Sequence, residues 1–175
     1  TISGNMGGVV VNASNSNQIA FYTEATSNSD SGVFVSKDGG KTWDEAKIDG
    51  SQYSAITIGS QNTSTLYVAG RHFPNGEDCE DEEDEDDCTP EKNSAIFISN
   101  DFGTSWIKSS SIPKGVFKEI ELEEGQELEE EDIDKVRVLY VNPSDDDHIF
   151  VGTSNLLLKS NDRGSSWKSL SDSFH

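Results

Sequence analysis

The stretch SKDGGKTW, residues 36 to 43, combines a serine, an aspartate, two glycines and a threonine with a tryptophan at its end. The same pattern recurs as SNDFGTSW at 99 to 106 and as SNDRGSSW at 160 to 167, so all three read S-x-D-x-G-x-[ST]-W. Their first serines lie 63 and 61 residues apart, a spacing typical of one supersecondary unit per repeat. The motif therefore indicates a chain built from three copies of one unit.

Short strands are predicted on both sides of each motif. Runs rich in Val, Ile, Phe, Tyr and Leu are bounded by Asn, Ser, Gly and Asp, and helical periodicity is almost absent. Each unit is predicted to hold two strands joined by a polar turn, a third strand, the motif and a short fourth strand. The units are expected at about 8–50, 53–113 and 135–175. The predicted fold class is thus all-β, with three four-stranded antiparallel units.

The motif has a mechanical interpretation as the hairpin turn between the third and fourth strands. The aspartate accepts backbone hydrogen bonds, the glycine takes a positive φ, and the serine and threonine hydroxyls bond across the turn. The tryptophan is expected to fold back on the sheet and bury its ring. We interpret these residues as structural and not catalytic. They are Ser36, Asp38, Gly40, Thr42, Trp43, Ser99, Asp101, Gly103, Ser105, Trp106, Ser160, Asp162, Gly164, Ser166 and Trp167.

The signature resembles the Asp-box, or bacterial neuraminidase repeat, of β-propellers. That family includes sialidases, xyloglucan-cleaving glycosidases, photosystem II assembly factors and the lumenal domains of sortilin-type sorting receptors. The resemblance covers nearly the whole chain and implies propeller blades, but the repeat serves unrelated functions. Propellers typically close with four to eight blades, so three blades leave two open edges. We expect a segment of a larger propeller or of one completed by other protomers; a compact three-unit monomer with capped edges is the alternative.

The net charge of −20 is concentrated in two insertions. Residues 77–91 hold 11 acidic groups and residues 119–134 hold 10, with no Lys or Arg in either, while the rest of the chain has 12 acids against 13 bases. The first insertion joins the second and third strands of its unit, and the second joins the middle unit to the last. In antiparallel units, both connections emerge on the face opposite the motifs. An acidic face is therefore predicted there.

Three interpretations of the acidic face remain open. The segments could be solvated charge that aids solubility, a calcium site without EF-hand spacing, or a docking surface for a basic peptide or protein. Nucleic acid is excluded as a partner because its phosphates would be repelled. No cofactor other than this possible Ca²⁺ is expected. The candidate residues for a cation or basic ligand are Asp81, Asp84, Asp86, Asp87, Glu129, Glu131 and Asp132.

The only two cysteines, Cys79 and Cys88, bracket the densest part of the first acidic run. A disulfide between them is favoured over a zinc site, because two thiols without a nearby histidine do not make a zinc ligand set. The disulfide predicts an oxidising compartment, secreted or lumenal. The sequons at Asn12 and Asn62 are candidate glycosylation sites and also favour a secreted or lumenal location. No signal peptide is visible at Thr1, and no apolar run is long enough to span a membrane.

Catalysis has to be considered because the resembling family contains glycosidases. Sialidases of this fold grip a carboxylate with three arginines, and this chain has only Arg71, Arg137 and Arg163. The first two are expected on the acidic face and the third in a motif turn on the opposite face, so the triad is not expected to assemble. We predict a non-enzymatic, extracellular or lumenal binding or assembly module. The alternative is a fragment or subunit of a glycoside hydrolase, sialidase-like or xyloglucanase-like.

Overall fold

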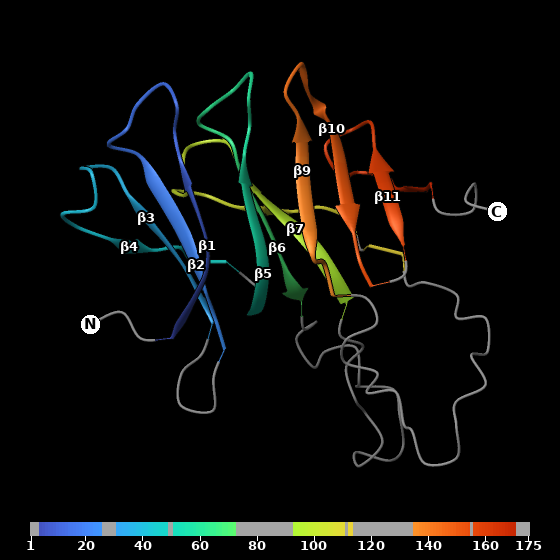
Figure 1. Ribbon diagram of the computed structural model, residues 1–175, viewed down its shortest axis with the longest axis horizontal. Coiled ribbons are helices and arrows are strands. Elements are labelled where there is room, and N and C mark those ends of the chain that lie inside the picture. The colour runs from blue at the N-terminus through green and yellow to red at the C-terminus, as the bar shows by residue number, and fades with distance from the viewer. Residues whose placement is uncertain are drawn as a thin grey trace, which may run out of the picture.

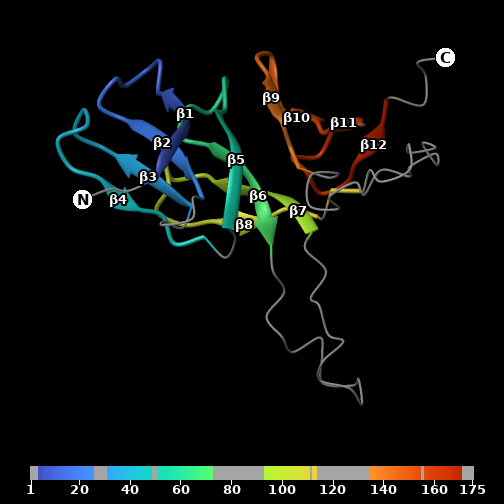
Figure 2. The same ribbon diagram turned by 60° about the horizontal axis from the view of Figure 1, so that its bottom comes forward.

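The computed structural model describes residues 4–25, 31–48, 51–72, 93–110, 112–113, 135–154 and 156–170. These residues form strands and turns arranged as three four-stranded antiparallel sheets, which we call blades 1, 2 and 3. Figure 1 and Figure 2 both show the blades following one another from left to right in chain order. The arrangement confirms the predicted all-β class with three four-stranded antiparallel units. Within the described ranges, no helix is long and apolar enough to cross a bilayer.

Each blade is a meander in which successive strands are neighbours. Blade 1 contains β1 (Asn5–Val11), β2 (Ile19–Glu24), β3 (Gly32–Ser36) and β4 (Asp44–Glu45). Blade 2 contains β5 (Ser51–Ile58), β6 (Leu66–His72), β7 (Asn93–Ser99) and β8 (Ile107–Lys108). Blade 3 contains β9 (Val138–Asn142), β10 (Asp145–Gly152), β11 (Leu157–Ser160) and β12 (Lys168–Ser169).

The two faces of blade 2 pack against different neighbours. Leu66 and Val68 lie in clusters shared with blade 1, whereas Tyr67 and Ala69 lie in the cluster shared with blade 3. Because side chains alternate across a strand, β6 must be apolar at consecutive positions to serve both sides. We call the side of a blade that faces the next blade its leading face, and the other side its trailing face. The seams between blades 1 and 2 and between blades 2 and 3 hold most of the core.

The motif tryptophans are only half-buried, which corrects the expectation of a buried ring. They lie on the trailing faces: Trp106 packs against the clusters of the first seam, and Trp167 packs against the cluster of the second. On blade 1, which has no preceding blade among the described residues, Trp43 meets the edge of Phe21 with ring centroids 4.8 Å apart. Burial is partial because each ring sits at the outer end of its sheet, beside the two-residue fourth strand.

Candidate functional site

The motif aspartate organises the turn between the third and fourth strands. In blade 1, Asp38 Oδ1 accepts hydrogen bonds from the Lys41 and Thr42 backbone N–H groups at 3.0 and 2.9 Å. Its Oδ2 accepts one from Thr42 Oγ1 at 2.7 Å. Ser36 Oγ donates to Asp38 Oδ1 and accepts from the Gly40 N–H. The whole arrangement is local, because every partner lies within seven residues of sequence.

Blades 2 and 3 repeat this hydrogen-bond pattern. Asp101 accepts from the Thr104 and Ser105 backbone N–H groups and from the Ser105 hydroxyl at 2.6 Å. Asp162 accepts from the Ser166 backbone N–H and, at 2.6 Å, from its hydroxyl. The chain has threonine in the first motif and serine in the other two at this position, and all three hydroxyls reach the carboxylate. In each blade the carboxylate therefore accepts hydrogen bonds from backbone N–H and hydroxyl groups of its own turn.

These hydrogen bonds lower the pKa of all three motif aspartates. The Thr42 backbone N–H and then its hydroxyl lower the pKa of Asp38 to about 2. The Ser105 hydroxyl and then its backbone N–H lower that of Asp101 to about 2, and the Ser166 hydroxyl is the largest cause of the lowered pKa of Asp162. Charged groups that accept several hydrogen bonds stay ionised near neutral pH. The motif aspartates are thus turn acceptors and lack the proton a general acid must give.

A pair of left-handed residues closes each turn. Gly40, Gly103 and Gly164 have φ values of 86°, 85° and 84°. The residue before each also has a positive φ, and in two blades it is not glycine: Phe102 has φ 53° and Arg163 has φ 55°. Burial of the Phe102 ring in the first seam offsets the cost of this conformation. The N–H of Phe102 donates to Ser64 O in the same blade at 2.9 Å.

The motif turn and the turn between the first two strands lie at one edge of every blade, which we call the motif edge. A backbone N–H of the motif donates to that neighbouring turn in all three blades: Gly39 to Asn17 O, Phe102 to Ser64 O and Arg163 to Asp147 O. Figure 1 shows the turns between the first two strands of the three blades at the top of the molecule. The motif edge is therefore the same edge in each blade, as the antiparallel order predicts.

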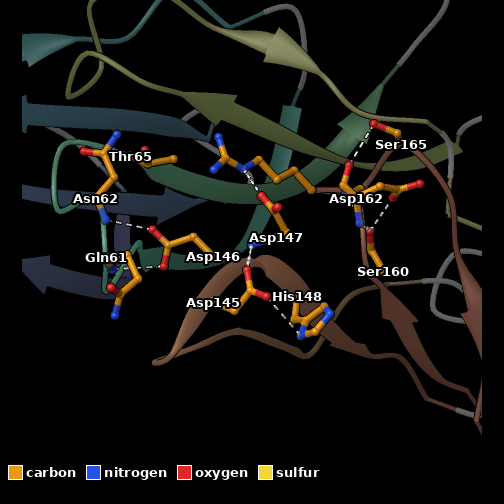
Figure 3. A network of polar contacts seen from close by, with 12 residues as sticks. Gln61, Asn62, Thr65, Asp145, Asp146, Asp147, His148, Ser160, Asp162 and Ser165 are labelled. Atoms are coloured by element: carbon orange, nitrogen blue, oxygen red, sulfur yellow. Dashed lines mark hydrogen bonds and ion pairs between the residues drawn. The ribbon is translucent and has the colours of Figure 1, made fainter.

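A buried carboxylate, Asp146, joins blade 3 to blade 2 at the motif edge. Its side chain is 4% exposed, and Oδ1 accepts from the backbone N–H groups of Ser60 and Gln61 at 2.9 and 3.1 Å. Its Oδ2 accepts from the Asn62 N–H at 2.8 Å. Figure 3 shows Asp146 pointing toward Gln61 and Asn62. One carboxylate thus satisfies three backbone donors of the β5–β6 turn in the neighbouring blade.

Gly59 makes room for this carboxylate. A Cβ at Gly59 would lie 2.7 Å from Asp146 Oδ2 and 2.5 Å from Asn62 O. Sequence analysis missed both residues, because the run of three aspartates at 145–147 reads as an ordinary polar turn. The structure separates the three: Asp146 points into the seam, whereas Asp147 forms an exposed ion pair with Arg163, with Asp147 Oδ1 2.6 Å from Arg163 Nε.

The first seam uses a different side chain at the equivalent place. Asn12 is 3% exposed, and its Nδ2 donates to Gln18 Oε1 in its own turn and to Thr63 O of blade 2. A glycan on Nδ2 would replace one of these two donated hydrogens and would need space at a buried atom, so the folded chain disfavours the predicted modification at Asn12. The side chain of Asn62, the other predicted site, is exposed.

Two further contacts link the motif turns across the seams. Lys37 Nζ donates to Thr104 Oγ1 in the next blade at 2.8 Å, and the Ser110 N–H and hydroxyl both donate to Gly164 O. In blades 1 and 2 the tryptophan Nε1 donates to the corresponding glycine carbonyl. In blade 3 Ser110 occupies that carbonyl, and among the described residues the buried Trp167 Nε1 has no hydrogen-bond partner. In blade 3 the hydrogen bonds from Ser110 across the seam thus take the place of the local tryptophan hydrogen bond.

The opposite edge of the sheets carries the strand ends next to the two acidic insertions. β6 ends at His72, β7 begins at Asn93 and β9 begins at Val138, and Figure 1 shows these ends together at the bottom of the molecule. Buried Arg71 lies near the end of β6, and exposed Arg137 precedes β9 and donates from Nε to Ser154 Oγ at 3.0 Å. Arg163 lies at the motif edge. The three arginines are therefore divided between the two edges, as the sequence predicted.

The predicted ligand and disulfide residues lie outside the described residues. They are Cys79, Asp81, Asp84, Asp86, Asp87, Cys88, Glu129, Glu131 and Asp132. In the described part of the chain, no group of three or more His, Cys, Asp or Glu side chains is placed to hold a metal ion. The candidate functional site is thus the edge opposite the motifs, which the structure locates by its flanking strand ends.

Solved structures with the same architecture are β-propellers. An ancestral GH74 enzyme aligns with a TM-score of 0.61 and 18% identity, over 95% of this chain and 19% of its own. The GH74 xyloglucanase from Xanthomonas campestris aligns with a TM-score of 0.56 and 18% identity, over 95% of this chain and 21% of its own. YCF48 bound to D1 peptide aligns with a TM-score of 0.52 and 12% identity, over 95% of this chain and 40% of its own.

Identities this low show the fold alone. No family model and no curated protein matches the sequence. The chain spans about a fifth to two fifths of the length of the propeller proteins it resembles. Its three blades therefore have the architecture of a partial β-propeller.

Proposed function

We propose that this chain is a non-enzymatic binding module built of Asp-box propeller blades, which presents an acidic edge to a basic peptide or protein. The observation that carries the proposal is how acidic residues are divided between the two edges of the blades. At the motif edge the three motif carboxylates and Asp146 are occupied by hydrogen bonds to backbone N–H and hydroxyl groups. The strand ends that flank residues 77–91 and 119–134 lie together at the other edge.

Electrostatics favour a basic partner over a small-molecule substrate. The two insertions hold 21 of the 33 acidic residues of the chain, and they contain no Lys or Arg. Charge gathered at one edge attracts an oppositely charged ligand over about 8–10 Å at moderate ionic strength and speeds its association. YCF48, a protein of the same fold, has been solved with a bound peptide. The proposal places this chain in an oxidising compartment, secreted or lumenal, where Cys79 and Cys88 form a disulfide.

The test is titration of a fluorescently labelled Lys- and Arg-rich peptide, followed by anisotropy. The parent chain should bind it, and binding should weaken as salt rises. A variant with residues 80–87 changed to Asn and Gln should lose most of the affinity. A matched control that exchanges Asp for Glu and Glu for Asp in the same run keeps the charge and should keep the affinity.

Other outcomes discriminate between the remaining functions. No peptide binding by the parent refutes the proposal. Loss of binding in the Asp–Glu exchange variant, together with a calcium-specific rise in melting temperature that magnesium does not reproduce, would identify a cation site instead. Cleavage of xyloglucan or sialylated glycans by the chain, abolished by the Asn and Gln variant, would establish the glycoside hydrolase alternative.

A further inference from the structure

The leading face of blade 3 and the trailing face of blade 1 expose apolar inner-strand residues. Val138 and Tyr140 on β9 are 58% and 50% exposed, and Val9 and Val11 on β1 are 56% and 49% exposed. The positions of Val9 and Val11 recur in blade 3, whose trailing face is covered by the preceding blade. Aligned on the strand pairs Val11–Ile19 and Val141–Ile149, Leu139 corresponds to Val9 and Val141 to Val11. Both are buried against blade 2, at 8% and 3% exposed.

Aromatic rings extend both exposed faces outward along the sheet. On the trailing face of blade 1, Phe21 stacks on Phe34 with centroids 5.2 Å apart, and Trp43 meets the edge of Phe21. Phe21 is itself buried, so the accessible apolar surface there belongs to the half-buried Phe34 and Trp43 rings. On the leading face of blade 3, the rings of Tyr140 and Phe150 lie 6.5 Å apart. Each terminal face therefore continues the kind of surface that forms the two internal seams.

The outer strands of the first seam carry one acid and one base, whereas the second seam has Ile107 and Ser169 at the same positions. Asp44 pairs with Val35 and so lies on the leading face of blade 1. Lys108 pairs with Phe97 and so lies on the trailing face of blade 2. The first seam thus brings a face with an outer acid against a face with an outer base.

The terminal faces carry the reverse pair of charges. Lys168 pairs with Lys159, whose Nζ lies 5.6 Å from the centroid of the Phe150 ring on the leading face of blade 3. Glu45 pairs with Phe34 on the trailing face of blade 1. The base at position 168 occupies the place of Asp44, and the acid at position 45 occupies the place of Lys108. In the part of the chain that the structure describes, these two faces are therefore complementary in the sign of one outer charge and alike in apolar character.

We propose that a second copy of this chain docks head to tail, with the leading face of blade 3 packed on the trailing face of blade 1 of its neighbour. The proposal goes beyond the proposed function and needs only the partial-propeller architecture of the three blades. Two copies of three blades supply six, within the four to eight typical of closed propellers. The contact is heterologous, so it closes into a ring when the rotation permits.

The experiment is sedimentation equilibrium of the full 175-residue chain across a dilution series. The weight-average mass should rise from that of one chain, 19.1 kDa, toward that of two or more. Glu45→Lys and Lys168→Glu should each remove this rise, because either change sets like charges against each other across the contact. Glu24→Lys, the same charge change at an exposed position at the end of β2, is the matched control and should leave association intact.

Mixing the two variants makes the test specific. A Glu45→Lys chain and a Lys168→Glu chain have complementary faces for each other but not for themselves. An equimolar mixture should therefore regain the mass of the parent, while each variant alone stays a monomer with the parent's circular dichroism spectrum. A parent that remains monomeric, or a mixture that fails to associate, overturns the proposal. The anisotropy titration separates this result from failure of the ligand proposal, since peptide binding is measured independently of mass.

Discussion

Replacing Asp146 with alanine tests whether a side chain in blade 3 holds the turn of blade 2. The substitution removes three acceptor contacts at once, to the N–H groups of Ser60, Gln61 and Asn62. Those donors belong to a turn 84 to 86 residues away in sequence. The change therefore acts on the seam and leaves the strands of each blade with their own hydrogen bonds.

The magnitude follows from the number and setting of these hydrogen bonds. A hydrogen bond to a charged group contributes about 1.5–3 kcal/mol, and its loss costs most when the donor stays buried. Here Ser60, Gln61 and Asn62 are exposed residues, so water reaches part of the turn once the carboxylate is gone. We therefore expect a loss of about 2–4 kcal/mol in the free energy of unfolding, below the simple sum of three charged hydrogen bonds.

Urea unfolding followed by tryptophan fluorescence measures this loss as a lower midpoint at unchanged m-value. Asp147→Ala is the matched control, because it removes the adjacent carboxylate and its exposed ion pair with Arg163. Exposed pairs contribute about 0–1 kcal/mol, so this variant should stay close to the parent. Equal midpoints for Asp146→Ala and the parent would refute the assignment of Asp146 as the seam contact. A fall in m-value would instead show that blade 3 unfolds separately.

Three further predictions concern the motif and the cysteines. Trp106→Ala should lower the free energy of unfolding by about 2–3 kcal/mol, less than the loss of a fully buried ring would. Trp43→Ala should lower it by less, because Trp43 borders no seam in the described chain. Equal losses in the two variants would contradict this ranking. Because Asp101 has a folded pKa of about 2, below its ordinary value of 3.8, the folded chain binds fewer protons. The stability that Asp101 contributes should therefore persist above about pH 4 and disappear as the pH falls toward about 2, and Asp101→Asn should flatten this part of the pH–stability curve. Thiol titration of unreduced protein should find no free thiol at Cys79 or Cys88; two reactive thiols would disprove the disulfide.

Equivalent positions of the repeat have different roles in the two seams. Asp146 is the fifth of the seven residues between the paired Val141 and Ile149 of blade 3, and Thr63 is the fifth of the seven between the paired Ile58 and Leu66 of blade 2. In the first seam the Asn12 side chain reaches across to the Thr63 carbonyl. In the second, Gly59 has no side chain to offer, and the Asp146 side chain crosses in the opposite direction. The same place in the fold is thus bridged by whichever blade supplies the longer side chain.

Sequence alone determined the features of this protein whose contacts are local. The motif predicts its own hairpin because Asp38 finds its donors within four residues, and the spacing of the motifs counts the blades. The distribution of acidic residues is likewise readable, and the antiparallel order assigns both insertions to one edge.

Only the tertiary structure decided how the blades meet. The roles of Asp146 and Gly59, the burial of Asn12 and the partial exposure of Trp106 all depend on residues brought together across a seam. Three consecutive aspartates are alike in sequence, and only the neighbouring blade distinguishes the one that points inward. Local hydrogen bonds are specified by residues a few positions apart. Seam contacts join residues 51 to 86 positions apart, and their partners become defined only when whole sheets have packed.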